Sequence, residues 1–560
     1  MKDLLEITSY IYIADRKIKR GGDEDIEFHS WSRKLLFKMP VRKPTFWNKP
    51  KIKESLVKAL TFMSGDLSYE FEFIAGGRDS GQLVLTDSEE IKFDAKPNSC
   101  VCLFSGGLDS LAGAISKLKE GKNLILVSHR SSNPTVSSIQ EQILNKLIKS
   151  YPNRIQHFVF TCNLSGGNRA AEETQRTRVF LYTSIAISLM SLASEKAIYV
   201  FENGITSLNF PKRADAINAR ASRTTHPKTI SFLEDFFSLF SGETIKVEHP
   251  FVSLTKSEVV NIIKENNHLD FINSTLTCTK TFDRFEHNTS ATHCGRCSQC
   301  IDRRFAMYAN EIEKYDAIYD LDIAKDEIND QEGFTHLLDY LYLKTQFELT
   351  TEMSFWGDFS NEIAEVIDFM QGTARREKFD SLFSLIKKHV EYVNKAIKRI
   401  RSEEDLSKPR MQRSLFHILD EREHLKEPVE RFAEEVAALL KSHIPLAFRT
   451  QKPANEQVLN DQIQTLLKSK GFEREFPVLL YATAKTVPDH SKNNLFIEGK
   501  YPRNKASQSK ITDEIAADIT KYGNAYKLFV VYDPEKRISD KDKFQSGIEA
   551  HPNCKLIILN

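Results

Sequence analysis

The feature that most constrains the fold is a change of pattern at Ser99. From this residue on, short apolar runs alternate with segments whose apolar residues recur at helical spacing. Strands that alternate with helices predict an α/β domain on a parallel sheet, because parallel strands need crossover connections. The candidate strands are residues 100–104, 124–128, 155–161 and 197–201. The candidate helices are residues 110–119, 138–150 and 178–192. We expect a doubly wound sheet with its ligand at the carboxyl ends of the strands.

The chain of 560 residues is too long for one hydrophobic core, which stops growing beyond roughly 250–300 residues. We therefore expect about two to four domains. Its 41% hydrophobic and 28% charged content is typical of a folded globular protein. With a formal net charge of +1, any nucleic-acid contact must come from local clusters of basic residues. We find no secretion signal and no apolar run long enough to cross a membrane, so we expect a cytoplasmic protein without a membrane partner.

Shifts in sequence texture divide the chain into four segments. Residues 1–97 hold alternating, β-prone stretches such as 69–73, and predict a β-rich N-terminal domain. Residues 98–310 form the predicted α/β domain. A helical region is expected over 311–450, where residues 382–400 keep one apolar stripe typical of a packed bundle face. Residues 451–560 again mix helices and strands and predict a second α/β domain.

A glycine-rich loop follows the first predicted strand. It reads Ser105-Gly106-Gly107-Leu108-Asp109-Ser110 and runs into an apolar helix. Paired glycines let backbone N–H groups approach phosphate oxygens, and the helix N-terminus and the serine hydroxyls add further donors. A polyphosphate would repel Asp109 unless a divalent cation or an orienting role offsets its charge. This favours a Mg²⁺-assisted site with Asp109 as a catalytic residue. An ordinary strand-to-helix turn is the alternative.

Four of the eight cysteines gather in one short stretch. Cys294, Cys297 and Cys300 lie at C-x-x-C spacing, and Cys278 supplies a fourth thiol just upstream. Thiolates at this spacing suit tetrahedral zinc, and a closed four-thiolate shell leaves no open position for catalysis. We expect a structural zinc site. An iron–sulfur cluster and unligated buried thiols are the alternatives.

The loop sequence S-G-G-x-D-S resembles the fingerprint of the PP-loop ATP pyrophosphatases, which have a HUP-like α/β fold. Together with the four cysteines it resembles the QueC family of 7-cyano-7-deazaguanine synthases, over about residues 99–308. The resemblance extends to Arg178, which would bind the nucleotide, and to Pro250, Lys256 and Glu258 ahead of a short helix. It implies that ATP adenylates the carboxylate of 7-carboxy-7-deazaguanine and that ammonia attacks the activated carbonyl, with dehydration then giving the nitrile.

Two stretches depart from the QueC pattern. Ser128-His129-Arg130-Ser131-Ser132-Asn133 stands where QueC proteins usually carry Tyr-Gly-Gln-Arg-His, and the stretch after Gly204 also differs. With the extra domains, these departures resemble the QueC-like proteins of antiphage systems such as Qat and type IV CBASS. That resemblance implies partners from a defence operon and conjugation of a deazaguanine group to a protein amine.

The C-terminal segment holds a second candidate site. Asp489 in a predicted turn, with Glu498 and Lys500 on one face of the following strand, can hold Mg²⁺ and activate water beside a phosphate. The pattern resembles the PD-(D/E)-x-K restriction-endonuclease fold. This resemblance implies DNA as a partner and Glu456, on the preceding helix, as a further catalytic carboxylate. The basic residues that could meet DNA phosphates are Arg503, Lys505, Lys510 and Lys521.

The leading interpretation is an ATP-dependent QueC-like enzyme joined to a nuclease-like domain in antiphage defence. One alternative is a nucleic-acid-binding or DNA-cleaving effector whose ATP site is regulatory. The other is a tRNA-modifying enzyme of the queuosine pathway without a defence role.

Overall fold

The computed structural model describes the chain except for residues 21–31, 77–95, 131–132, 163–175, 211–222, 281–287, 289, 371–373, 406, 408, 422–427, 476, 478, 482–483, 493, 503–507 and 524. The chain divides into two compact units whose boundary lies between Leu425 and Lys426. Most of the first three segments expected from the sequence thus packs as one unit. None of the helices in the described part of the chain has the length and hydrophobicity that crossing a lipid bilayer requires.

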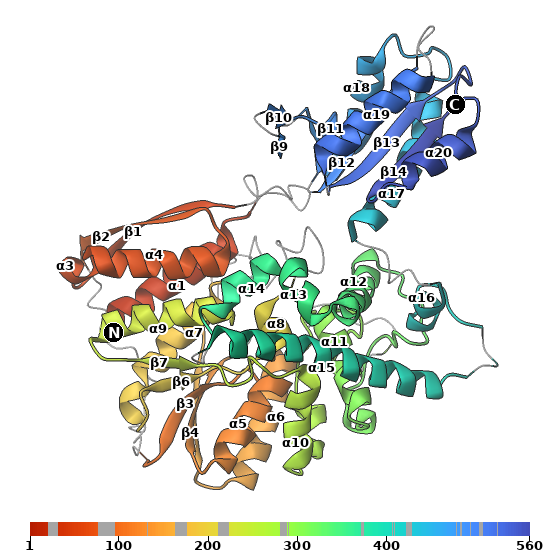
Figure 1. The fold of residues 1–560 in the computed structure, drawn as a ribbon. Coiled ribbons are helices and arrows are strands. Elements are labelled where there is room, and N and C mark those ends of the chain that lie inside the picture. Colours follow the sequence, from red (N-terminus) through yellow and green to blue (C-terminus); the bar gives the residue numbers. More distant parts are fainter. Residues whose placement is uncertain are drawn as a thin grey trace. The chain divides into compact units, whose positions relative to one another are not determined.

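A parallel five-stranded sheet organises the first unit, in the order β5-β4-β3-β6-β7 (Figure 1). Its strands are β3 (Ser99–Leu103), β4 (Asn123–His129), β5 (Ile155–Phe160), β6 (Ala197–Tyr199) and β7 (Lys246–Glu248). Four of them confirm the predicted strands, and β7 was not predicted. The chain moves outward from β3 to β4 and β5, then returns to β6 on the other side of β3. The carboxyl ends of β3 and β6 therefore flank a switch point, where open α/β sheets bind their ligands.

Helices cover both faces of this sheet, which makes it doubly wound as predicted (Figure 1). They are α5 (Leu108–Lys119), α6 (Pro134–Ser150), α7 (Arg178–Ser188), α9 (Pro227–Ser241), α10 (Lys256–Glu265) and α11 (Ser298–Ala309). The short helix α8 (Gly204–Leu208) packs instead against the helical region that follows α11. Val101 of β3 packs into one core with α7 and α9. Its neighbours Cys100 and Cys102 pack into the opposite core with α5, α6 and α10, because strand side chains alternate between faces.

The N-terminal segment corrects the prediction of a β-rich domain. Its described elements are α1 (Lys2–Lys17), β1 (Lys34–Val41), α3 (Pro44–Trp47), α4 (Pro50–Ser64) and β2 (Ser68–Ala75). The alternating stretch does form β2, which pairs in parallel with β1. However, Leu4, Ile7 and Ile11 of α1 recur at helical spacing and are buried, as is one face of α4. These helices share their core with Val101 of β3 and Phe180 of α7, so the segment is part of the same unit.

The region after α11 is helical, as predicted. It comprises α12 (Gln331–Leu349), α13 (Glu352–Asp358), α14 (Ser360–Ile367), α15 (Arg375–Ser402) and α16 (Leu415–Glu421). The apolar stripe lies on α15, where Leu385, Ile386 and Val393 are fully buried, and this confirms a packed bundle face. Short 3-10 turns lie at η1 (Met190–Leu192), η3 (Leu269–Ser274), η4 (Glu313–Tyr315) and η6 (Lys468–Lys470).

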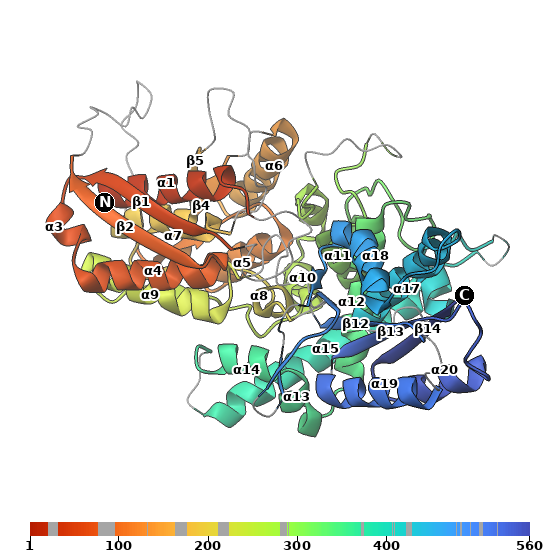
Figure 2. The same ribbon diagram turned by 90° about the horizontal axis from the view of Figure 1, so that it is seen from above.

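The second unit is a mixed sheet between two helical layers, in the order β14-β13-β12-β11-β8. Its elements are α17 (Pro428–Ala447), α18 (Glu456–Leu467), β8 (Glu473–Arg474), β9 (Leu479–Tyr481), β10 (Ala484–Thr486), β11 (His490–Lys492), β12 (Leu495–Lys500), α19 (Gln508–Tyr522), β13 (Tyr526–Tyr532), α20 (Lys541–Glu549) and β14 (Cys554–Leu559). Strands β12, β13 and β14 are parallel, while β11 is antiparallel to β12. Figure 2 shows α17 and α18 on one face and α19 and α20 on the other. Helix α17 belongs to this unit, so the unit begins before the expected residue 451.

Candidate functional sites

The glycine-rich loop joins β3 to α5 at the carboxyl edge of the first sheet. Gly106 has φ +82, and a Cβ there would lie 3.3 Å from Gln140 Cγ. A Cβ on Gly107 would lie 3.3 Å from the backbone oxygen of Leu276. The left-handed conformation and the close packing explain why glycine stands at these positions. The loop thus brings its backbone to the N-terminus of α5, where peptide N–H groups attract anions.

The two serines of the loop lie together, as a phosphate site requires. Ser105 Oγ and Ser110 Oγ are 3.2 Å apart, and Ser110 Oγ donates to the carbonyl of Gly107 at 3.0 Å. Leu108 is fully buried and anchors the first turn of α5. The donor set of Ser105, Gly106, Gly107 and Ser110 fits a polyphosphate, as predicted for ATP, although its binding role stays a prediction.

Asp109 is surrounded by donors from the protein. Lys256 Nζ donates to Asp109 Oδ1 at 2.8 Å, and both side chains are almost fully buried. The backbone N–H and the side-chain amide of Asn203 donate to Asp109 Oδ2 at 3.1 and 3.2 Å. Two of these donors come from the loop after β6, and the third comes from the start of α10. The geometry therefore supports an orienting role for Asp109, in which it ties three segments of the sheet edge together.

Glu202 completes this buried charge cluster. Burial acts to raise the pKa of Asp109, but the charge of Lys256 and hydrogen bonds from Glu202, Lys256 and Asn203 outweigh it and lower that pKa to about 2. Burial and the negative charge of Asp109 raise the pKa of Glu202 well above its usual value. One ionised carboxylate, one carboxyl group of raised pKa and one ammonium group therefore share the switch point. Lys256 was expected from the resemblance to QueC, but neither its contact with Asp109 nor the presence of Glu202 beside them was predicted.

Arg178 is the first residue of α7 and is exposed. Its guanidinium lies 5.7 Å from the ring centre of Tyr182, which stacks on His129 at the end of β4. Burial, and then the charge of Arg178, lower the pKa of His129. Because β4 neighbours β3, Arg178 lies at the same edge of the sheet as the loop. Its contact with a nucleotide remains a prediction.

The four predicted cysteines come together in one buried cluster. Their Sγ atoms all lie within 4.8 Å of one another. Zinc with Zn–S bonds of about 2.3 Å would separate tetrahedral sulfurs by about 3.8 Å, and Cys294 Sγ and Cys300 Sγ are 3.9 Å apart. The N–H of Cys297 donates to Cys294 Sγ at 3.3 Å, as expected for a thiolate acceptor. A Cβ on Gly295 would lie 2.0 Å from a backbone oxygen, so only glycine fits this turn. The residues therefore fit zinc.

The cysteine cluster is linked to the nucleotide loop through residues 276–278. The N–H of Leu276 donates to the carbonyl of Gly106 at 3.1 Å, two residues before Cys278. Arg303, from the helix that begins after Cys297, donates to Thr275 and Thr277 at 3.0 and 3.2 Å. A metal bound by these cysteines would therefore fix the segment that covers the loop.

The predicted acidic residues of the second unit also come together. The pairing of His490 with Ile497 places Asp489 and Glu498 opposite each other on β11 and β12. The N–H of Gly499 donates to Asp489 Oδ2 at 2.9 Å, and that of Asp489 lies 3.3 Å from Glu498 Oε1. Glu456, at the start of α18, accepts from the N–H of Tyr501 at 3.1 Å. Asp489 thus begins a hairpin strand, and the two carboxylates can share one Mg²⁺.

Lys500 and helix α19 surround Glu498 on its other side. Lys500 Nζ lies 3.3 Å from Glu498 Oε2 and 3.2 Å from Asp518 Oδ2, and the hydroxyl of Tyr522 donates to Glu498. Burial and the neighbouring Asp489 raise the pKa of Glu498 to about 8, despite Lys500. Asp518 and Tyr522 were not predicted from the sequence. Their i, i+4 spacing on the helix after the E-x-K strand was the available signal.

Two of the predicted DNA-contacting residues, Arg503 and Lys505, lie outside the described residues. Lys510 is exposed and 4.0 Å from Glu514. Lys521 is half-exposed and pairs with Asp518 at 3.2 Å. Both lie on α19, Lys521 at the end next to Glu498 and Lys510 near the other end, and both remain candidates for phosphate contacts.

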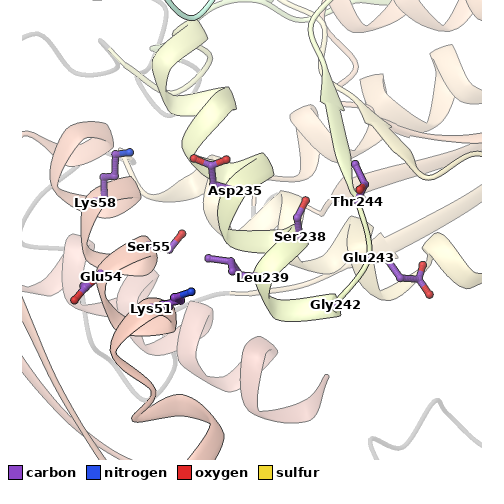
Figure 3. Close-up of a pocket in the computed structure, with 10 residues that line it drawn as sticks. All are labelled: Lys51, Glu54, Ser55, Lys58, Asp235, Ser238, Leu239, Gly242, Glu243 and Thr244. Carbon is purple, nitrogen blue, oxygen red and sulfur yellow. The ribbon is translucent and has the colours of Figure 1, made fainter.

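An open groove of about 730 Å³ lies between α4 and α9 in the first unit (Figure 3). Its lining mixes basic side chains such as Lys51 and Lys58 with acidic ones such as Glu54 and Asp235. It contains none of the predicted site residues. Charges of both signs on a shallow surface favour no ligand class, so we assign no site to it.

Comparison with protein families separates the two units in the same way. Residues 169–311 match the family model Queuosine biosynthesis protein QueC, a range that includes Lys256 and the four cysteines and begins after the nucleotide loop. Residues 486–559 match the model REase_DpnII-MboI, a range that includes Asp489, Glu498 and Lys500. No curated protein matched the chain. The protein therefore combines a QueC-like domain with a restriction-endonuclease-like domain at its C-terminus.

Proposed function

We propose that the first unit is an ATP-dependent enzyme that adenylates the carboxylate of a 7-deazaguanine base and transfers the acyl group to an amine. The observation that supports this most directly is the loop Ser105–Ser110, whose hydroxyls and glycine backbone converge at the N-terminus of α5. The loop lies in the same compact unit as the QueC match. The product would be an amide, a nitrile or a conjugate with a protein amine.

In this proposal the loop binds the triphosphate of ATP and its Mg²⁺, and Asp109 with Lys256 holds the loop against β6. The substrate carboxylate attacks the α-phosphorus and pyrophosphate leaves. The amine nitrogen then attacks the acyl carbon and AMP leaves with the bonding electron pair. The residues of the chain bind and orient the reactants, which accounts for much of the rate enhancement in such two-substrate reactions.

Exchange of labelled pyrophosphate into ATP, dependent on 7-carboxy-7-deazaguanine, tests the first step. Ser110→Ala should lower the exchange rate at least about tenfold, because it removes a hydrogen bond to a charged group. Ser116→Ala is the matched control on the same helix, where the Ser116 hydroxyl donates to Glu120 at 3.3 Å. Wild-type protein that catalyses no exchange at any Mg²⁺ concentration would refute the proposed function.

We further propose that the reaction serves antiphage defence, with a protein amine from a defence operon as acceptor. The departures at residues 128–133 and the appended nuclease-like domain support this assignment. Intact-mass spectrometry of the operon proteins after incubation with the enzyme, ATP and 7-carboxy-7-deazaguanine should show the added deazaguanine acyl group. If no protein gains mass and a free nitrile accumulates, the chain is instead an enzyme of the queuosine pathway.

A second function, Mg²⁺-dependent DNA cleavage, rests on the second unit. Asp489 and Glu498 face each other across a hairpin and Lys500 lies beside them, within the restriction-endonuclease match. The carboxylates would hold the ion, and Lys500 would orient the attacking water. Phage and plasmid DNA should be cut with Mg²⁺ or Mn²⁺ by the wild type and by Glu514→Ala, but not by Glu498→Ala. Equal behaviour of the three proteins would remove the cleavage function.

A further inference from the structure

His249 is a buried histidine at the carboxyl end of β7 that none of the roles above uses. Its side chain is 8% exposed. Its Nε2 lies 3.0 Å from the carbonyl oxygen of Glu202 and 3.2 Å from Ser207 Oγ. A carbonyl can only accept, so Nε2 carries the ring proton. The other ring nitrogen, Nδ1, is therefore a hydrogen-bond acceptor.

Nδ1 lacks a donor in the structure. It is buried and has no hydrogen-bond partner among the described residues. Burial lowers the pKa of His249 to about 4, and the charge of Asp109 opposes this only in part, so the ring is neutral at neutral pH. An unsatisfied buried acceptor costs about 1–3 kcal/mol. A ligand that donates an N–H would remove this cost.

The position of His249 indicates which N–H donor it would meet. Its Nε2 contacts the backbone of Glu202, whose neighbour Asn203 holds Asp109 of the nucleotide loop. His249 therefore lies beside the switch point between β3 and β6, on the side away from β4. The proposed reaction brings two components to this switch point besides ATP, namely the acid and the amine. No carboxylate among the described residues contacts Nδ1, so the Ser207–His249 pair lacks the third member of a nucleophilic triad.

We propose that His249 is the positioning residue of an amine subsite, in which Nδ1 accepts a hydrogen bond from the N–H of the attacking nitrogen. The inference rests on the proposed adenylation. The nitrogen lone pair forms the C–N bond, AMP leaves with the electrons of the acyl–oxygen bond, and one proton passes from nitrogen to solvent. His249 stays neutral throughout and directs the lone pair toward the acyl carbon. The subsite would take ammonia or a primary amine.

Two substitutions separate the two ring nitrogens. His249→Asn places an amide near the position of Nδ1 and keeps an acceptor there, whereas His249→Gln places its amide near Nε2. With ammonium chloride as the amine source, His249→Gln should raise KM for ammonium about tenfold or more, as loss of one hydrogen bond predicts. His249→Asn should restore most of that loss. Ser207→Ala is the control, because it removes a partner of Nε2 and leaves Nδ1 untouched.

Acid-dependent pyrophosphate exchange needs no amine. Its rate should stay within about twofold of wild type in all three variants, which corresponds to a change in activation free energy smaller than RT. Equal KM values for ammonium in the Asn and Gln variants would refute the amine subsite. A raised KM for the acid in the exchange reaction would refute it too, because Nδ1 would then bind the base.

A measurement without turnover distinguishes failure of this inference from failure of the proposed function. In the intact chain with ¹⁵N-labelled histidine, ammonium chloride should shift the Nδ1 resonance of His249, assigned by its absence in His249→Gln. Should wild-type protein show no acid-dependent exchange, the proposed function fails, and this titration still decides the inference. An unmoved Nδ1 resonance at saturating ammonium would overturn it.

Discussion

Each unit of this protein holds a buried acid next to a lysine, and the two pairs differ in protonation. Asp109 and Lys256 lie 2.8 Å apart, and the pKa of Asp109 is lowered to about 2. Glu498 and Lys500 lie 3.3 Å apart, yet the pKa of Glu498 is raised to about 8. Burial acts to raise both carboxyl pKa values. The difference must therefore come from the neighbours of each acid.

The two acids differ in the hydrogen-bond donors and in the acidic side chains that surround them. Asp109 accepts hydrogen bonds from Asn203 as well as Lys256, and it is the pKa of its acidic neighbour Glu202 that is raised. Lys500 is shared between Glu498 and Asp518, and Asp489 adds a third negative group. The charges of Asp489 and Asp518 both oppose ionisation of Glu498, whereas the charge of Lys256 and a hydrogen bond from Glu202 favour that of Asp109. The first arrangement suits a fixed scaffold, and the second suits a site that gains a metal ion.

The largest predicted effect tests whether the first unit, unlike the second, needs a bound metal ion for its folding stability. Because structural zinc contributes its binding energy to folding, Cys297→Ser should abolish stoichiometric zinc and destabilise the first unit by several kcal/mol, about 3 or more. Elemental analysis and hydrogen–deuterium exchange of α11 and residues 274–280 provide the measurement. Cys162→Ser, outside the cluster, should keep its zinc. Equal protection of these segments in both variants would contradict the prediction.

The next effect concerns the lysine of the ionised pair. Lys256→Met leaves Asp109 buried without its counter-charge and should lower the free energy of unfolding by about 3 kcal/mol or more. Lys264→Met, on the same helix but exposed, should change it by less than about 1 kcal/mol. Urea denaturation followed by fluorescence measures both variants. Similar midpoints for the two would show that Lys256 is not the partner on which Asp109 depends.

The raised pKa of Glu498 predicts the pH dependence of the metal site. Mg²⁺ needs the ionised carboxylate, which falls about tenfold per pH unit below about 8. Cleavage at subsaturating Mg²⁺ should therefore rise about tenfold per unit between pH 6 and pH 7. The sign is opposite for stability, because protonated Glu498 stabilises the fold below about 4.5 and this contribution is lost as pH rises toward 8. A flat cleavage profile from pH 6 to 8, with DNA binding unchanged, would contradict the raised pKa.

Substitution of each acid by its neutral amide tests the difference in protonation between Glu498 and Asp109. Glu498→Gln mimics the protonated side chain and should change the free energy of unfolding at pH 6 by less than about 1 kcal/mol. Asp109→Asn removes an ionised group from its donors and should cost about 2 kcal/mol at the same pH. Chemical denaturation of both variants at pH 6 tests the pair. A larger loss of unfolding free energy in Glu498→Gln than in Asp109→Asn would contradict the difference in protonation between the two acids.

The smallest effect is expected at an exposed lysine near the Glu498–Lys500 pair. Lys521 is about half exposed and pairs with Asp518 at 3.2 Å, so Lys521→Met should shift the free energy of unfolding by less than about 0.5 kcal/mol. Lys500 is largely buried, so Lys500→Met should lower the free energy of unfolding by clearly more. The two lysines contact the same carboxyl group, so denaturation curves of both variants isolate the contribution of burial.

Much of both candidate sites was predictable from sequence because their residues are close together in the chain. The loop from Ser105 to Ser110, the three cysteines within 294–300, and Glu498 with Lys500 are local patterns, whose spacing sets their relative positions. The strands β3 to β6 were predicted for the same reason. Helix α1 was missed, since the predicted β-rich domain was drawn from alternation elsewhere in the first 97 residues.

The contacts that decide protonation are of another kind. Asp109 and Lys256 are separated by 147 positions, and Glu202 and His249 reach them only because β6 lies next to β3 in the sheet and β7 lies next to β6. The amino-acid sequence alone thus determined which functional groups the chain carries and in which local patterns. The tertiary structure decided which of them ionise, because a pKa depends on burial and on charges that the fold brings within a few ångströms.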